Sequence, residues 1–307
     1  MKNLPLQNPT HQRIEKAFQE WLKVMGYAPN TIYSLPLHVR EFFHWLEQKC
    51  DLSRPFEKTL ENVVPSDIEL YFFHLKTRTC TRKTGAMSVN NLHKHRQALK
   101  RLSYYLKETG QAFLEIDITL PKQQRKLKEI LTKAEIQQLY DRCDRTPLGI
   151  RDSAMLALFY GCGLRRTEGV GLDVSDILFD QKMIYVRKGK HYKERYVPMT
   201  QEVKNELENY LNYGRPVLLK DPNQPSFFVS ERGTRPQGQS LYLRLKKLAQ
   251  KMELGREIGL HDLRHSIATH LLQSGMKLTH IAKFLGHDSM ESTQIYTHIM
   301  NETEENE

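Results

Sequence analysis

The stretch LHDLRHSIATHLL, residues 260–272, brings two imidazoles and a guanidinium close together: His261, Arg264 and His265. The two histidines are four residues apart, so a helix would put them on one face, as in the HExxH zinc motif. However, Asp262 stands where that motif has glutamate, Arg264 would repel a dication, and the sequence identifies no third ligand. A phosphate site fits better, because a guanidinium offers a bidentate fork and an imidazole a proton or hydrogen bond. An ordinary solvated helix face remains the alternative.

The spacing of the apolar residues predicts how this helix sits. Leu263, Ile267 and Leu271 recur every four residues and should face the core. His261 and Arg264 are three apart and should lie side by side on another face of the helix. The expected phosphate cradle is therefore on the side away from the core.

Four segments together carry a resemblance to a known family. HDLRHSIATHLL and LGHDSMESTQIYTH closely resemble the C-terminal signature of the tyrosine recombinase (phage integrase) family. Upstream, LALFYGCGLRRTEGVGL resembles that family's first motif, and GKHYKERYVP resembles its lysine-bearing β-hairpin. The motifs occur in the family's order and span roughly residues 132–299.

The resemblance implies a role for each matching residue. It makes Arg165 and Arg264 phosphate-binding arginines, with His261 as the acid/base histidine beside Arg264. His287 would support the transferring phosphate, and Tyr296 would be the nucleophile. Glu168 matches an acidic position that orients the site rather than reacting.

The general acid is assigned with an alternative. An ungapped match of GKHYKER to the family's GKGxKxR pattern puts the catalytic lysine at Lys190. His191 replaces the glycine that usually follows, so the turn can differ, and Lys188 is the second candidate. Lys188, Lys190 and Lys193 could also be a solvated basic turn.

The implied reaction is cleavage and rejoining of duplex DNA through a 3′-phosphotyrosyl link, with no cofactor and no metal. The resemblance also implies a homo-tetramer acting on two DNA sites, in a Xer-type recombinase or a small mobile-element integrase, for integration, excision or resolution. Two alternatives stay open: a DNA-binding regulator that keeps the fold without activity, and a type IB topoisomerase-like enzyme.

Composition agrees with a nucleic-acid partner. The 307-residue chain has 46 Lys and Arg against 36 Asp and Glu, a net charge of +10. A basic enzyme with another substrate would show the same balance. The four cysteines form no CxxC pair, and neither a signal peptide nor an apolar run of membrane-spanning length is evident, so we expect a cytoplasmic protein with no membrane contact.

The first hundred residues predict helices over 10–25, 30–49, 66–77 and 88–110. The last of these has an inner stripe of Leu92, Leu99, Leu102 and Leu106. Basic residues lie off that stripe and in the preceding loop TRTCTRKTG, and they form either a solvated face or a DNA-backbone contact. The candidates are Arg82, Lys83, His93, Lys94, Arg96, Lys100 and Arg101.

The predicted organisation is mainly α-helical, in two domains. Residues 1–117 should form a helical core-site DNA-binding domain and 118–131 a basic linker. Residues 132–307 should form the catalytic domain, mostly helical with a small antiparallel sheet. That domain should open on a capping box of Thr132 and Glu135 and contain a hairpin with strands at 183–187 and 194–198.

Overall fold

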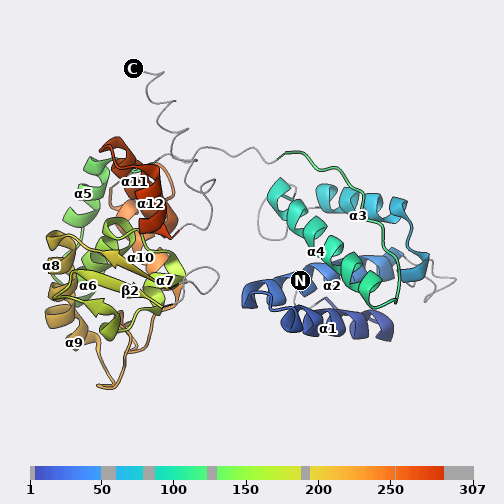
Figure 1. The fold of residues 1–307 in the computed structure, drawn as a ribbon, viewed down its shortest axis with the longest axis horizontal. Helices are drawn as coiled ribbons and strands as arrows, with labels where there is room; N and C mark the ends of the chain where they lie inside the picture. The colour runs from blue at the N-terminus through green and yellow to red at the C-terminus, as the bar shows by residue number, and fades with distance from the viewer. Residues whose placement is uncertain are drawn as a thin grey trace, which may run out of the picture. The chain divides into compact units, whose positions relative to one another are not determined.

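A computed structural model describes residues 4–49, 60–78, 87–122, 130–187, 194–252 and 254–286 of the chain. The chain divides into two compact units, Met1–Arg125 and Lys126–Glu307 (Figure 1). Among the described residues, no helix is long and apolar enough to cross a membrane.

The described part of the N-terminal unit consists of four α-helices and a short 3-10 turn, Leu60–Asn62. Three of the helices begin with proline, whose fixed φ suits the first helical position and which has no N–H to leave unpaired there. The bounds of the helices are α1 Pro9–Val24, α2 Pro29–Lys49, α3 Pro65–Thr77 and α4 Val89–Glu108.

The core of this unit is aromatic and leucine-rich. Helix α2 packs against α1 and α4, and the predicted stripe of α4 leucines is fully buried. The predicted helices are thus confirmed, with bounds that differ by a residue or two.

The segment after α4 is extended and packs on the same unit. Ile118 and Leu120 lie against its core, and α4 holds the segment through bonds from His93 Nε2 to Pro121 O (3.0 Å) and from Arg96 to Ile118 O (3.3 Å). The division between the units, after Arg125, falls inside the predicted linker.

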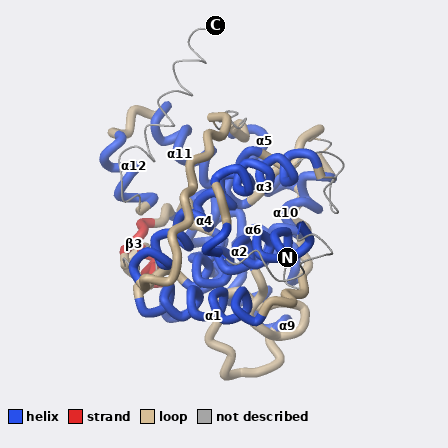
Figure 2. The backbone as a smooth tube through the Cα atoms, turned by 90° about the vertical axis from the view of Figure 1, so that its right-hand side faces the viewer, coloured by secondary structure: helices blue, strands red, loops and turns tan. Residues whose placement is uncertain are grey.

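The described part of the C-terminal unit is mostly helical with one small sheet (Figure 2). The capping box is confirmed: Thr132 Oγ1 accepts from Glu135 N (3.1 Å), and Glu135 Oε2 accepts from Thr132 N (2.7 Å). Its α-helices are α5 Lys133–Asp141, α6 Pro147–Leu156, α7 Arg166–Gly171, α8 Gln201–Asn209, α9 Arg215–Leu218, α10 Gly238–Gln250, α11 Leu260–Gln273 and α12 Leu278–Leu285.

The sheet has three antiparallel strands in the order β1 (Ile177–Leu178), β2 (Met183–Val186) and β3 (Arg195–Pro198). Strands β2 and β3 form the predicted hairpin, with Val186 paired to Arg195. The predicted fold class, mainly α with a small antiparallel sheet, is confirmed.

Candidate active site

A turn at Gly163 carries Arg165 into the site. Helix α6 widens into a π-helical turn, Ala157–Gly161, and the chain then reverses at Gly163, whose φ is +58°. A Cβ at Gly163 would lie 2.8 Å from Leu285 Cδ2, so glycine is needed both for the left-handed backbone and for this close approach. Two residues later Arg165 caps the N-terminus of α7.

Glu168 is the centre of the site. Its buried carboxylate accepts from the backbone N–H of Arg165 (2.8 Å) and from the Arg165 guanidinium (2.8 Å). Arg195 of β3 binds both carboxylate oxygens, at 3.0 and 2.8 Å. Arg264 Nη1 lies 4.0 Å from Glu168 Oε2. One carboxylate therefore gathers three arginines, from the N-cap of α7, from β3 and from α11.

The bonds of Glu168 lower the pKa of its carboxyl more than burial raises it. Burial by itself would raise the pKa of this carboxyl, but the ion pairs and hydrogen bonds with Arg195 and Arg165 lower the pKa to about 2. Glu168 is thus ionised at neutral pH and bonded to the guanidinium groups of Arg165 and Arg195, an arrangement that suits the orienting role implied by the family resemblance. It cannot serve as a proton donor there.

The end of α12 holds the two predicted phosphate-binding arginines. Arg264 donates to Leu285 O (2.7 Å) and to Gly163 O (2.6 Å), and Arg165 donates to Gly286 O (2.7 Å). Carbonyls at a helix C-terminus carry partial negative charge and suit cationic partners. Gly286, with φ +66°, ends α12.

The burial of α11 differs from the prediction. Leu263 is fully buried as expected, but Ile267 and Leu271 are only partly buried, and Arg264 is buried rather than displayed on an open face. The reason is that the Gly163 turn and α12 cover this side of α11 with carbonyl groups and the apolar side chain of Leu285. Arg264 therefore lies in a preformed polar socket.

His261 is exposed at the first turn of α11, and His265 is partly buried on the next turn. Asp262 accepts from Gly259 N (2.8 Å) and so caps the helix N-terminus. Within the described ranges, neither histidine belongs to a group of three potential metal ligands.

Arg195 is the residue that the sequence interpretation missed. Its signal was the final arginine of GKHYKER, which stood in the quoted pattern without a role. Because Arg195 is paired with Val186 at the loop end of β3 and also bonded to Glu168, it fixes this end of the hairpin to the arginine cluster.

Several predicted site residues lie outside the described residues. They are the catalytic candidates Lys190, His287 and Tyr296, the alternative lysines Lys188 and Lys193, and the basic-loop residues Arg82 and Lys83.

The predicted DNA-contacting residues of α4 fall into two groups. Lys94, Lys100 and Arg101 are exposed, and the Arg101 guanidinium lies 5.6 Å from the ring centroid of Tyr27. His93 and Arg96 are partly buried and hold the extended segment after α4. A structural role accounts for these last two.

Comparison with known proteins agrees with the motifs. Residues 129–303 match the model of the phage integrase family. The chain is 34% identical over 243 residues to tyrosine recombinase XerC of Oceanobacillus iheyensis, covering 78% of each chain. It is 31% identical over 304 residues to tyrosine recombinase XerD of Haemophilus influenzae, covering 98% of this chain and 96% of that one.

Solved structures share the fold. The XerH site-specific recombinase in a pre-cleavage complex with its difH substrate superposes with a TM-score of 0.70 at 23% identity, covering 95% of this chain and 83% of that one. A lambda integrase fragment bound to a core site gives a TM-score of 0.68 at 15% identity, covering 93% and 94%. With the arginine cluster and the ordered motifs, these matches show that the chain belongs to the phage integrase family and is a Xer-like, site-specific tyrosine recombinase.

Proposed function

We propose that this recombinase cleaves one strand of duplex DNA by attack of Tyr296 on a phosphodiester that Arg165, Arg264 and His261 hold. The observation that carries the proposal is the shared socket of the two arginines. Glu168 and the last carbonyls of α12 orient both guanidinium groups before DNA binds. His287 follows Gly286 directly in the sequence and would support the same phosphate.

The chemistry of these groups suits the reaction. A phenol has an ordinary pKa near 10, and the phosphodiester that it must attack already carries a negative charge. The pentacoordinate transition state concentrates more charge on the non-bridging oxygens. Preoriented arginines stabilise that charge more than the ground state, because they need no reorganisation during the step.

The leaving oxygen needs a proton, and the broken phosphodiester has to be conserved in another bond. The tyrosyl oxygen forms a bond to phosphorus, the 5′ bridging oxygen leaves, and Lys190 gives that oxygen a proton. The 3′-phosphotyrosyl link keeps the phosphoester bond, so rejoining by a 5′ hydroxyl needs no nucleotide cofactor. A homo-tetramer on two DNA sites, acting in integration, excision or resolution in the cytoplasm, completes the proposal.

The nucleophile is tested with a nicked, labelled DNA site that traps the covalent product. Tyr296→Phe should bind the site and form no covalent adduct, because the variant lacks the attacking oxygen. Tyr213→Phe removes an exposed hydroxyl of the same unit and should behave as wild type. A covalent band of wild-type intensity from Tyr296→Phe would refute the assignment.

The lysine is tested with a substrate that has sulfur in place of the 5′ bridging oxygen. A thiolate leaves without a proton, whereas an alkoxide needs one. Lys190→Ala should therefore be about a hundred- to ten-thousand-fold slow on the oxygen substrate and close to wild type on the sulfur substrate. Selective rescue of Lys188→Ala instead would transfer the role to Lys188. Equal slowing of Lys190→Ala on both substrates would mean that Lys190 positions the phosphate and donates no proton.

The alternatives predict different products. A recombinase joins strands from two sites, whereas a topoisomerase-like enzyme relaxes supercoiled DNA with one site and an inactive regulator forms no adduct. The matches to tyrosine recombinases do not favour either alternative.

A further inference from the structure

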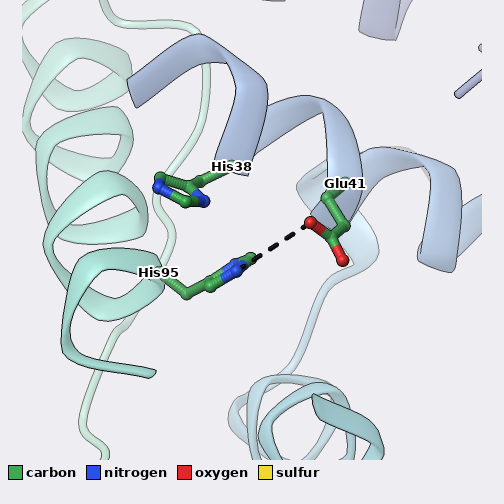
Figure 3. A group of neighbouring side chains, drawn as sticks. All are labelled: His38, Glu41 and His95. Atoms are coloured by element: carbon green, nitrogen blue, oxygen red, sulfur yellow. Dashed lines mark ion pairs between the residues drawn. The ribbon is translucent and has the colours of Figure 1, made fainter. Parts of the chain in front are cut away.

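The core of the N-terminal unit contains a cluster of polar groups that recombination chemistry does not use. His38 and Glu41 lie one turn apart on α2, and His95 faces them from α4 (Figure 3). One potential ligand atom from each lies within 4.8 Å of the others. His95 is 0% exposed and Glu41 4% exposed, while His38 is partly buried.

Each member has a buried atom without a hydrogen-bond partner among the described residues: His38 Nδ1, Glu41 Oε2 and His95 Nε2. His95 Nε2 and Glu41 Oε2 are 3.9 Å apart, too far for a direct hydrogen bond. A buried polar atom without a partner costs about 1–3 kcal/mol. Three of them in one cluster indicate that another group satisfies them.

The opposite sides of two members are already held. Arg78 pairs with Glu41 Oε1. Tyr71 Oη lies 2.9 Å from His95 Nδ1. When His95 Nδ1–H donates to Tyr71, the Nε2 lone pair points to the cluster. An outer partner of this kind is what orients a metal-binding histidine.

We propose that His38, Glu41 and His95 bind a zinc ion within the N-terminal unit. Two imidazoles and a carboxylate form a known zinc ligand set, with a fourth position for water. Zinc–ligand bonds of 2.0–2.2 Å place tetrahedral ligands about 3.4 Å apart, so the side chains have to converge by about 1 Å. The partial exposure of His38 leaves a route for entry.

The ion would bind side chains of two helices at once, in place of the 3.9 Å separation between His95 Nε2 and Glu41 Oε2. It would connect α2 to α4, and through Tyr71 it would fix α3 as well. Helix α4 also carries the exposed Lys94, Lys100 and Arg101. Zinc would thus stiffen the helix that is proposed to contact DNA, without entering the reaction.

The test is a zinc titration of the full chain, without a histidine tag, in competition with a chromophoric chelator. We expect the wild-type protein to bind one zinc ion per chain. Zinc affinity should fall by about a hundredfold or more in each of three variants: His38→Gln, Glu41→Gln and His95→Gln. Tyr71→Phe should weaken binding by about ten- to a hundredfold, since it removes only the outer partner. His44→Gln changes a histidine of the same helix outside the cluster and should bind as wild type.

Folding of each variant can be read from tryptophan fluorescence, because both tryptophans, Trp21 and Trp45, lie in this unit. Should the buried His95→Gln variant fail to fold, the partly exposed His38→Gln variant decides. The proposal is overturned by wild-type protein that takes up no stoichiometric zinc, which would leave water as the occupant. It is overturned equally by zinc uptake that the cluster variants do not reduce.

Discussion

Two buried carboxylates, Glu168 in the C-terminal unit and Glu41 in the N-terminal unit, show opposite ways of placing a charge in a protein core. Both oxygens of Glu168 are bonded, by Arg195 and Arg165, and Arg264 lies nearby. Glu41 pairs with Arg78 through one oxygen, while the other oxygen faces the two imidazoles without a partner among the described residues.

The two carboxylates therefore suit different roles: Glu168 orients arginines, and Glu41 is suited to coordinate a metal ion. Both oxygens of Glu168 have partners within the protein, so its arginines are held ready for an anion that comes from outside. In the Glu41 cluster, no hydrogen-bond donor among the described residues reaches Glu41 Oε2, so the cluster is suited to take up a ligand of its own. A carboxylate with all its bonds made serves as a scaffold, and one with a bond still to make is a candidate site.

The largest effect should come from Glu168→Gln. The amide keeps the shape but loses the charge that gathers three guanidinium groups, so the arginines lose their orientation. We expect cleavage to slow by about a hundred- to a thousandfold, comparable with the loss of a transition-state donor. Single-turnover cleavage of a nicked site measures this rate.

Glu208→Gln is the matched control, since Glu208 is a partly exposed residue of α8 that pairs with Lys204 at 3.5 Å. It should leave the rate unchanged. A folded Glu168→Gln variant with wild-type cleavage would show that the carboxylate does not organise the site.

The next effect is on acid stability. Because the folded-state pKa of Glu168 is lowered from 4.5 to about 2, its contribution is fully present above pH 4.5 and is lost as the pH falls toward 2. The shift corresponds to about 3 kcal/mol of the free energy of unfolding. The C-terminal unit of Glu168→Gln should lack this part of the pH dependence.

Far-UV circular dichroism with denaturant, at a series of pH values between 5 and about 2, measures this contribution. Tryptophan fluorescence follows the N-terminal unit separately, since the sequence has its two tryptophans there. Parallel stability curves for wild type and variant over this range would contradict the assigned pair.

A smaller effect is expected for Arg195→Lys. Lysine keeps the charge but replaces a bidentate fork with one ammonium group, so Glu168 keeps Arg165 and loses a hydrogen bond to β3. One charge-assisted hydrogen bond is worth about 1.5–3 kcal/mol, so cleavage should slow by about ten- to a hundredfold.

Arg187→Lys changes an arginine at the other side of the same hairpin, bonded to Asp173 and Asp176 instead. It should affect strand stability and leave cleavage within a few-fold of wild type. Equal slowing in both variants would mean that Arg195 supports the hairpin in general rather than the arginine cluster.

The smallest effect concerns the exposed surface of the N-terminal unit. In Lys100→Gln, the slope of log DNA affinity against log salt concentration should become less steep by about one, because one phosphate contact is lost. Cleavage at saturating protein should not change. Lys23→Gln, on α1 and paired with Glu20, should alter neither quantity.

An unchanged salt slope for Lys100→Gln would mean that the exposed basic face of α4 is an ordinary solvated face and does not contact DNA. That outcome would leave the arginine cluster of the C-terminal unit unaffected, since the two sets of residues belong to different units.

The sequence by itself determined what periodicity and short-range motifs can encode. Helix bounds, the Thr132–Glu135 capping box, the hairpin and the end of α12 at Gly286 all follow from residues a few positions apart. The family also followed from the sequence, because four motifs in a fixed order are more specific than any one of them.

Only the tertiary structure decided which groups meet across elements. Arg264 is buried because a turn and a helix end distant in sequence supply carbonyls to it, which a helical pattern cannot show. Arg195 joins Glu168 from another element, and His38, Glu41 and His95 converge from two helices. Burial of a charged or polar side chain depends on such partners, and partners of this kind are set by packing rather than by local sequence.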